Sequence, residues 1–278
     1  MENIKRFFKI KKAIAGLIIL FVFICISIFA PYIAPYEYDY MDGLPMQGPC
    51  EEHLLGTTNV GQDILSLVIW STRSSLTVGL MTGLLTTCLA VIMGLTSGYF
   101  GSVTDDILSL IMNIFLVIPG LPLMIIIAAY IPVRGTGTIV MVLAFTGWAW
   151  GARVLRSQML SLKNQEFVNA SVVLGESSSH IIFKDIFPNM LSLIVANFFG
   201  SSLSAVLGEA SLEFLGLGDV NANTWGTMLY WAQNNQALLL GQWQWMTVPG
   251  ICIALLGTSF ALMNFAVDEI TNPKLRRK

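Results

Sequence analysis

The sequence predicts an all-α membrane protein with six transmembrane helices and both termini in the cytoplasm. Hydrophobic residues make up 55% of the 278 positions and charged residues only 12%, whereas a soluble domain carries about 25% charged residues. The charges also fall in clusters, and six uncharged windows between them are each long enough for a membrane-spanning helix. We therefore expect a multi-pass protein of the cell membrane, solvated mainly by the lipid bilayer.

Each uncharged window supplies one predicted span. The last window, residues 220–267, begins with a polar stretch that includes Asn221, Asn223 and Gln233, so only its second half is apolar enough to cross a bilayer. The six predicted spans are residues 13–34, 75–98, 107–131, 137–154, 189–208 and 246–267.

The first span has an alternative interpretation as a cleaved signal peptide, because a basic stretch precedes it. Its apolar run is longer than the usual signal core of about 7–15 residues, and Pro31 crowds the small-residue site near Ala30. We therefore expect an uncleaved first span.

Basic residues set the predicted orientation. An even number of spans places both termini on one side of the membrane. Of the 15 lysines and arginines, 13 lie in the N-terminal stretch, in the segment between spans four and five, and at the C-terminus. The opposite segments are acidic and include Glu51, Glu52, Glu209 and Glu213. Because cytoplasmic segments carry the excess of Lys and Arg, the three basic segments are predicted to be cytoplasmic.

Two outer segments are too long to be simple turns. Residues 36–73 are interrupted by proline and glycine and carry a predicted short helix at residues 61–70, before the second span. Residues 209–245 contain a helix-like run at residues 227–237. Both segments suit contact with an extracellular partner.

Small residues and tryptophans follow patterns that are typical of membrane proteins. Glycine pairs at i, i+4 spacing in three spans favour close helix packing in lipid, and the tryptophans favour an aromatic belt at the membrane interfaces over stacking on a substrate. The glycine pairs are Gly79 and Gly83, Gly94 and Gly98, and Gly147 and Gly151. The tryptophans are Trp70, Trp148, Trp150, Trp225, Trp231, Trp243 and Trp245.

A soft metal ion is one interpretation of the run Cys50, Glu51, Glu52 and His53 in the first outer segment. An acidic loop with one histidine and one cysteine is the commoner occurrence, and the four cysteines of the chain are too dispersed for a disulfide or metal framework. We expect no metal site and no cofactor.

We divide the chain into two units. Residues 1–72 hold the first span and the outer loop, and residues 73–278 form the transmembrane domain. The second unit includes residues 155–188, a predicted cytoplasmic segment that is neither apolar enough to span a bilayer nor obviously disordered.

A helix, a glycine bend and a second helix are predicted in this cytoplasmic segment. Gly175 is suited to end the first helix in a left-handed conformation. Ser177 or Ser178 can cap a second helix that runs through Ile181, Ile182 and Ile186, and Pro188 closes this helix or starts the next. One face of the first helix is formed by Phe167, Ala170, Ser171 and Leu174. From the residues alone, a rigid knob that transmits force and an inert helix lying in the headgroups both stay open.

The run EFVNASVVLG at residues 166–175, followed by Pro188 and Asn189, resembles the EAA loop of ABC importer permeases. In that family the loop forms coupling helices that dock in a cleft of the ATP-binding subunits. Asn169 stands where glutamate is usual and Ser171 where a second alanine is usual, which bears on the ionic part of the docking contact. The resemblance assigns the coupling role to Glu166, Phe167, Asn169, Ala170, Ser171, Gly175 and Pro188.

Further stretches narrow the resemblance to the C-type permease subunits of dipeptide, oligopeptide and nickel uptake systems. LGTTNVGQDILS at residues 55–66 is similar to their outer-loop signature, with Gln62 where arginine is frequent. LEFLGLG at residues 212–218, WG at residues 225–226 and DEITNPKLR at residues 268–276 are similar to the C-terminal half of these subunits.

The resemblance implies a set of partners. They are a second permease subunit in a heterodimer, two ATP-binding subunits and an extracellular solute-binding protein, with no nucleic acid. The sequence has no Gly-x-x-x-x-Gly-Lys-Ser/Thr phosphate loop, so ATP hydrolysis is expected on the separate subunits and the chain is not expected to be an enzyme. Closure of the ATP-binding pair is expected to push the knob and switch the path between inward-facing and outward-facing states.

Peptide is the expected cargo, with nickel or a nickel chelate, or an oligosaccharide, as alternatives within the same family. A secondary transporter driven by an ion gradient would place paired carboxylates or histidines at mid-membrane depth, and the predicted spans carry no charge at their centres. A membrane enzyme is disfavoured because the sequence contains neither His-Glu-x-x-His nor Gly-x-Ser-x-Gly.

Overall fold

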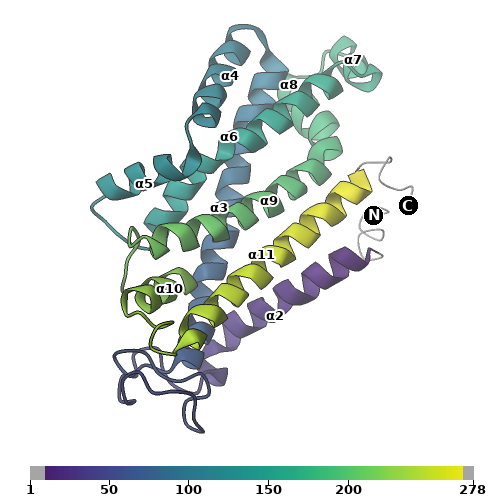
Figure 1. Cartoon of the computed structure of the whole chain (residues 1–278). Coiled ribbons are helices and arrows are strands. Elements are labelled where there is room, and N and C mark those ends of the chain that lie inside the picture. The colour runs from purple at the N-terminus through teal and green to yellow at the C-terminus, as the bar shows by residue number, and fades with distance from the viewer. Residues whose placement is uncertain (1–9, 272–278) are drawn as a thin grey trace.

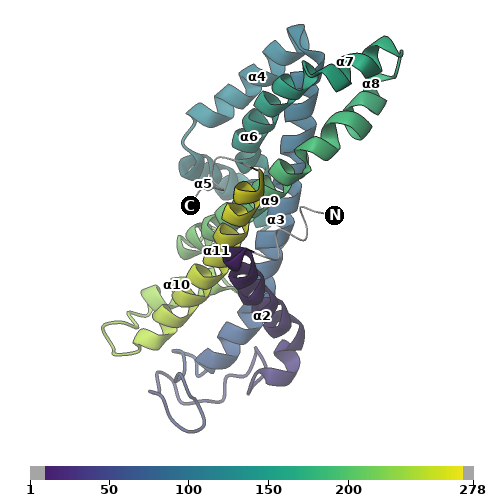
Figure 2. The same ribbon diagram turned by 90° about the vertical axis from the view of Figure 1, so that its right-hand side faces the viewer.

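The computed structural model describes residues 10–271, with side chains through residue 269, and shows an almost entirely helical protein (Figures 1 and 2). Five helices are long and apolar enough to cross a membrane. They are α2 (Lys11–Ile33), α3 (Ile64–Phe100), α6 (Thr136–Lys163), α9 (Phe187–Phe214) and α11 (Trp243–Thr271). Within the described residues, β-structure is limited to an isolated bridge between Thr57 and Asp63.

The third predicted span, residues 107–131, is a bent pair of helices. α4 (Ser102–Val117) and α5 (Gly120–Tyr130) meet at an angle of 92°. Pro119 explains the break, because proline disfavours a helical conformation in the residue before it, and Ile118 is extended with ψ at 127°. The predicted number of six spans is therefore reached only when this broken pair is counted as one span.

The helices extend beyond the predicted spans at their polar ends. α3 begins at Ile64, so the short helix predicted at residues 61–70 is the start of this long helix. Asp63 caps α3 by accepting a hydrogen bond from the backbone N–H of Ser66 at 2.8 Å. α6 likewise continues to Lys163. Hydropathy predicts only the part of a helix that is apolar enough for lipid. The helix itself can be longer, because other parts of the protein contact the polar residues at its ends.

The two long outer segments lie together at one end of the bundle (Figure 1). Residues 34–63 form a folded loop in which His53 Nδ1 lies 3.0 Å from the carboxylate of Asp63. α10 (Trp225–Asn234) confirms the helix predicted at residues 227–237. Residues of both segments line one shallow groove, so the two loops form a single surface.

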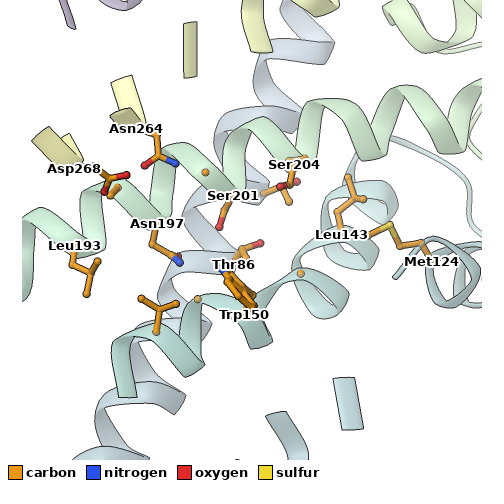
Figure 3. Close-up of a pocket in the computed structure, with 17 residues that line it drawn as sticks. Thr86, Met124, Leu143, Trp150, Leu193, Asn197, Ser201, Ser204, Asn264 and Asp268 are labelled. Atoms are coloured by element: carbon orange, nitrogen blue, oxygen red, sulfur yellow. The ribbon is translucent and has the colours of Figure 1, made fainter. Parts of the chain in front are cut away.

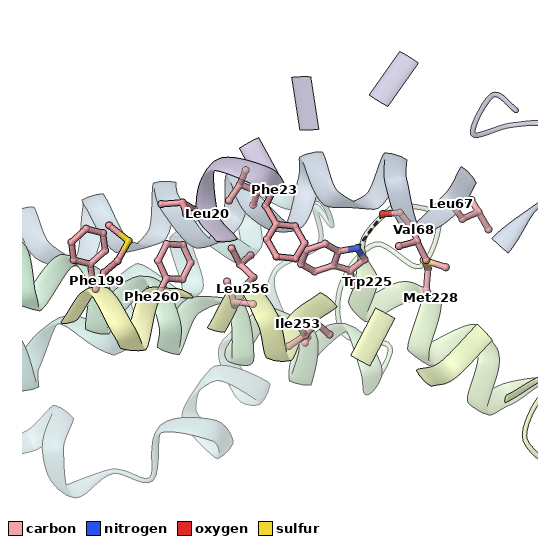
Figure 4. Packing of buried hydrophobic residues seen from close by; sticks show 14 of the residues in the cluster. Leu20, Phe23, Leu67, Val68, Phe199, Trp225, Met228, Ile253, Leu256 and Phe260 are labelled. Atoms are coloured by element: carbon pink, nitrogen blue, oxygen red, sulfur yellow. Dashed lines mark hydrogen bonds between the residues drawn. The ribbon is translucent and has the colours of Figure 1, made fainter. Parts of the chain in front are cut away.

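The largest hydrophobic core joins α2, α3, α9, α10 and α11 (Figure 4). Trp225 lies at its centre: the ring packs edge-on against Phe23 with centroids 5.4 Å apart, and Nε1 donates to the carbonyl oxygen of Val68 at 3.2 Å. Trp245 and Trp148 are also buried. The aromatic-belt prediction is wrong for these three tryptophans, because their rings complete the interior of the protein.

Two of the three glycine pairs bring helices together as predicted. Gly94 and Gly98 of α3 pack against α6, and a Cβ atom added to Gly98 would lie only 2.7 Å from Cβ of Met159. Gly79 and Gly83, also on α3, pack in the same way against α9. Such close approach supplies the van der Waals contact that holds helices together in lipid.

Two carboxylates that the sequence assigns to an outer loop lie inside α9. Glu209 and Glu213 are 0% and 1% exposed. The hydroxyl of Ser75 donates to Glu209 at 3.1 Å and accepts from the N–H of Trp225 at 3.2 Å, while the hydroxyl of Thr224 donates to Glu213. We call these five residues the outer network. The prediction fails because neighbouring helices supply the polar partners that water would otherwise provide.

Candidate coupling loop and polar groove

The segment between α6 and α9 forms two short helices joined by a glycine bend, as predicted. α7 (Glu166–Val173) is followed by Gly175 in a left-handed conformation, with φ at 80°. The N–H of Glu176 donates to the carbonyl of Ser171 at 3.1 Å, and the N–H of Gly175 donates to that of Val172 at 3.0 Å. This pair of hydrogen bonds ends the helix and redirects the chain.

The second helix of the segment continues without interruption into α9. Ser177 caps α8 (Ser178–His180), which passes into the π-helical turn η1 (Ile181–Ile186) and then into α9. Pro188 lies in the first turn of α9, which confirms the alternative that it starts the next helix, although the chain shows no break there. The wider π-helical turn accommodates a residue that has no backbone N–H. Residues 166–186, which we call the knob, are therefore a direct extension of α9.

Buried apolar side chains anchor the knob to the bundle. Val168 of α7 and Ile181 and Ile186 of η1 are at most 2% exposed. They pack with Met159 of α6 and Met190 of α9 in one hydrophobic core. Burial of side chains of this size stabilises a contact by about 1.5–3 kcal/mol each. The knob is therefore packed tightly against both α6 and α9.

The opposite side of the knob exposes large apolar side chains. Phe167 is 43% exposed, and the exposed fractions rise to 87% for Val173, 80% for Leu174 and 65% for Phe183. The predicted helical face that contains Phe167 and Leu174 therefore points away from the bundle. Clustered apolar residues on a surface are typical of a contact with another protein or with a membrane.

The structure brings six of the seven predicted coupling residues together on the knob. Ser171 is half-buried, and its hydroxyl donates to the Phe167 carbonyl at 3.3 Å. Pro188 lies apart from the other six, beyond η1. Val173 and Phe183 are also large, exposed apolar residues of the knob, but they are not among the predicted coupling residues. The six residues on the knob are Glu166, Phe167, Asn169, Ala170, Ser171 and Gly175.

A bidentate ion pair fastens α6 to α4 beside the knob. Nε and Nη2 of Arg156 lie 2.5 and 2.6 Å from the two carboxylate oxygens of Asp105. The hydroxyls of Ser97 and Ser109 also donate to Asp105. Paired, charge-assisted hydrogen bonds fix the relative orientation of two groups as well as their distance. The start of α4 is therefore held in a defined orientation against α6.

A groove of about 510 Å³, lined by both polar and apolar side chains and called the polar groove below, lies between α3, α6, α9 and α11 (Figure 3). Small residues leave this space open, among them Gly147 and Gly151 of α6 and Gly200 of α9. The third glycine pair, Gly147 and Gly151, therefore lines a groove, whereas the other two pairs lie where helices approach one another closely. The polar side chains that line the groove are Thr82, Thr86, Asn197, Ser201, Ser204, Asn264 and Asp268.

A bundle of spans with an open polar groove, and a helical knob fixed to two of those spans, is the architecture of a membrane transport subunit. Its carboxylate pair, Glu209 and Glu213, lies in the last two turns of α9 and is tied to Ser75 and Thr224. No group of three or more histidine, cysteine or acidic side chains able to hold a metal ion occurs in the described part of the chain.

The chain belongs to the family of binding-protein-dependent transport system inner membrane components, which matches residues 90–277. The N-terminal transmembrane domain of oligopeptide transport permease C matches residues 2–49. The chain is therefore a permease subunit of an ABC importer and a multi-pass protein of the inner membrane.

Relatives are similar over nearly the whole chain. The oligopeptide transport system permease protein OppC of Bacillus subtilis is 34% identical over 275 residues, which cover 98% of this chain and 88% of the relative. The dipeptide transport system permease protein DppC of the same organism is 33% identical over 278 residues, covering 98% and 85%. DppC of Haemophilus influenzae is 32% identical over 274 residues, covering 95% and 91%.

A solved structure of the MetNI methionine ABC transporter in inward-facing conformations shares the fold. The TM-score is 0.59 at 19% sequence identity, and the match covers 75% of this chain and 96% of that chain. This likeness supports the predicted all-α membrane fold.

Proposed function

We propose that the chain forms half of the translocation path of a peptide importer and that a second permease subunit forms the other half. Gly147, Trp150 and Ser204 line the groove and are exposed, so a single chain leaves the groove uncovered. Peptide is the proposed cargo because the relatives at 32–34% identity are named for oligopeptide or dipeptide transport.

The knob is the observation that carries this proposal. Val168, Ile181 and Ile186 hold one side to the bundle, while Val173 and Leu174 offer an apolar surface on the other side. That surface suits docking of an ATP-binding subunit, one for each permease subunit. ATP hydrolysis takes place on these partners, because the chain lacks a phosphate loop of its own.

Closure of the two ATP-binding subunits moves the knob, and α6 and α9 move with it as a unit. The Arg156–Asp105 pair carries the movement to α4, and the groove changes between inward-facing and outward-facing states. The solute-binding protein delivers cargo at the opposite end, where residues 34–63 and the segment before α10 form one surface.

The knob and both termini are proposed to be cytoplasmic. Lys12 Nζ lies 3.7 Å from the Glu269 carboxylate, so the start of α2 and the end of α11 are side by side, which supports termini on one side of the membrane. A single cysteine at position 173, in a chain freed of its four native cysteines, should react with an impermeant maleimide only after cells are opened. Labelling of intact cells would contradict the orientation.

The coupling role is tested in the assembled importer with Leu174→Asp. A charge in a desolvated interface is expected to lower retention of the ATP-binding subunits and the rate of peptide uptake by about tenfold or more. Leu239→Asp is the matched control, because Leu239 is 83% exposed, close to the 80% of Leu174, but lies between α10 and α11. It should retain the ATP-binding subunits.

Full retention and uptake by Leu174→Asp would remove the knob from the docking surface. The cargo is tested separately, by uptake of labelled peptides, nickel and oligosaccharides by the unmodified importer. Uptake of nickel or sugar without peptide would overturn the peptide assignment and leave the importer assignment in place.

A further inference from the structure

We infer that Asn197 and Asn264, together with Thr82 and Thr86, form a subsite that binds the main chain of a peptide in transit. This inference rests on the proposed peptide importer function and adds the residues that contact the cargo. All four side chains line the polar groove, from α9, α11 and α3 (Figure 3).

Asn197 is held in one orientation by two neighbouring helices. The hydroxyl of Thr87 on α3 donates to Asn197 Oδ1 at 3.2 Å. Its carboxamide also packs over Gly151 of α6, where an added Cβ atom would overlap the amide. Figure 3 shows the amide nitrogen directed from α9 toward Thr86 and Trp150. With Oδ1 occupied, the nitrogen is left to donate into the groove.

Asn264 is placed similarly from the opposite wall. It lies over Gly200 of α9, where an added Cβ atom would approach its amide nitrogen to 3.1 Å. Its carboxamide makes no hydrogen bond within the described part of the chain. A glycine on the neighbouring helix thus makes room for each of the two carboxamides, Gly151 for Asn197 and Gly200 for Asn264.

The two threonines differ from the other threonines of α3. The hydroxyls of Thr72, Thr77 and Thr96 donate to the carbonyl one turn earlier, at 2.9, 2.7 and 2.5 Å. Thr82 and Thr86 are 2% and 4% exposed, yet neither hydroxyl has a hydrogen-bond partner. Buried polar groups are normally paired, so two buried and unpaired hydroxyls behind the wall of a groove point to a ligand that reaches them when the groove changes shape during transport.

The chemistry of these groups fits a peptide main chain. A carboxamide offers one acceptor and two donors, and a peptide group presents one donor and one acceptor in every residue regardless of its side chain. A free metal ion would require several converging ligands such as carboxylates or imidazoles. The described groove wall carries a single ionisable group, Asp268, which is exposed. Neutral donors and acceptors suit a path that admits peptides of many sequences.

The test uses the complete importer with Thr82→Val and Thr86→Val combined. Valine keeps the shape of threonine, and no protein hydrogen bond is lost. We expect peptide uptake to fall by about fivefold to tenfold, because two hydrogen bonds to cargo are removed. ATP hydrolysis stimulated by the solute-binding protein should be retained. Thr77→Val is the control, because its hydroxyl bonds within α3 and does not line the groove.

Asn264→Leu, which is close to isosteric, should produce a similar loss. In both variants, the loss of uptake should be equal for trialanine and trilysine. When an ester replaces one peptide bond of the cargo, uptake by the unmodified importer should slow more than uptake by the variants. Should Asn264→Leu fail to assemble, the threonine pair decides the outcome alone.

Unchanged uptake by the threonine variant, or a loss confined to one peptide sequence, would overturn the subsite while leaving the proposed function intact. Failure of the unmodified importer to take up any peptide would refute the proposed function. Uptake of an oligosaccharide in its place, with the same loss in the variants, would overturn the main-chain assignment.

Discussion

Proteins usually bury apolar side chains and expose charged ones, and the knob and the outer network depart from this pattern in opposite ways. The knob exposes large apolar side chains such as Val173 and Leu174, whereas the outer network buries the carboxylates Glu209 and Glu213. Each buried carboxylate has a hydroxyl partner within the chain, Ser75 for Glu209 and Thr224 for Glu213, although Oε2 of Glu209 has none. The exposed apolar residues have no such cover. One end of the molecule therefore supplies hydrogen-bond partners from its own helices, whereas the other leaves an apolar surface uncovered, which suits the proposed contact with an ATP-binding subunit.

This contrast separates effects on stability from effects on coupling. A substitution in the outer network should destabilise the permease itself, because it leaves buried polar groups without partners. A substitution on the exposed side of the knob should leave stability almost unchanged and should affect transport. The following experiments test that separation, in order of decreasing expected effect on stability.

The largest loss is expected for Glu213→Ala. Removal of this carboxylate leaves the buried hydroxyl of Thr224 only the hydroxyl of Thr227, 3.2 Å away, as an acceptor and opens a cavity beside Gly226. The expected cost is about 3 kcal/mol or more, measured as a lower melting temperature of the purified complex in detergent. Glu213→Gln keeps an acceptor oxygen and similar volume, so its melting temperature should fall much less. Equal losses for the two variants would show that the hydrogen bond is unimportant.

A smaller loss is expected for Arg156→Ala, which removes the bidentate pair with Asp105. The pair is partly exposed, so the expected cost is about 1–2 kcal/mol. The fall in peptide uptake should be larger than the loss of stability alone would cause, because α4 would no longer move together with α6. Arg156→Lys keeps the charge but not the paired geometry, and its uptake should lie between those of Arg156→Ala and the unmodified importer. Normal uptake by Arg156→Ala would exclude the pair from coupling.

Gly175→Val and Gly241→Val form a matched comparison. Both glycines have φ at 80°, and neither has another atom near the position of an added Cβ. Each valine should therefore cost about 1–2 kcal/mol through backbone strain alone. Only Gly175→Val should also uncouple ATP hydrolysis from uptake, because it redirects the knob. Equal uptake by the two variants at equal abundance in the membrane would show that the bend is not used in coupling.

The smallest effect is expected for Glu176→Gln. This carboxylate lies 3.3 Å from Nδ1 of His180, four residues further along the chain, and both side chains are substantially exposed. An exposed pair of this kind contributes less than about 1 kcal/mol. The melting temperature should therefore change little. A loss as large as that of Glu213→Ala would contradict the view that the knob surface contributes little to the stability of the chain.

The helical bend of the knob could be predicted because its determinants are local. Gly175 ends α7 and Ser177 caps α8 through contacts with residues at most five positions away. Pro188 was harder to interpret, because a proline near a helix start is compatible with a boundary or with a continuous helix. The π-helical turn of η1 decided in favour of continuity.

The groove and the outer network could not be predicted from the same sequence. Asn197 and Asn264 are 67 positions apart, and only the packing of α9 against α11 brings them to one cavity. Glu209 and Glu213 follow an apolar window and so resemble residues that emerge into water. Their burial depends on Ser75 and Thr224, which distant segments supply.

The sequence by itself determined the membrane class, the positions of the apolar segments and the bend of the knob, because hydropathy and helix capping act over short stretches of chain. Only the tertiary structure decided which side of the knob is exposed, which glycine pair opens a groove and where two carboxylates can be buried. These properties depend on neighbours that are remote in the sequence, and helix packing alone determines which neighbours meet.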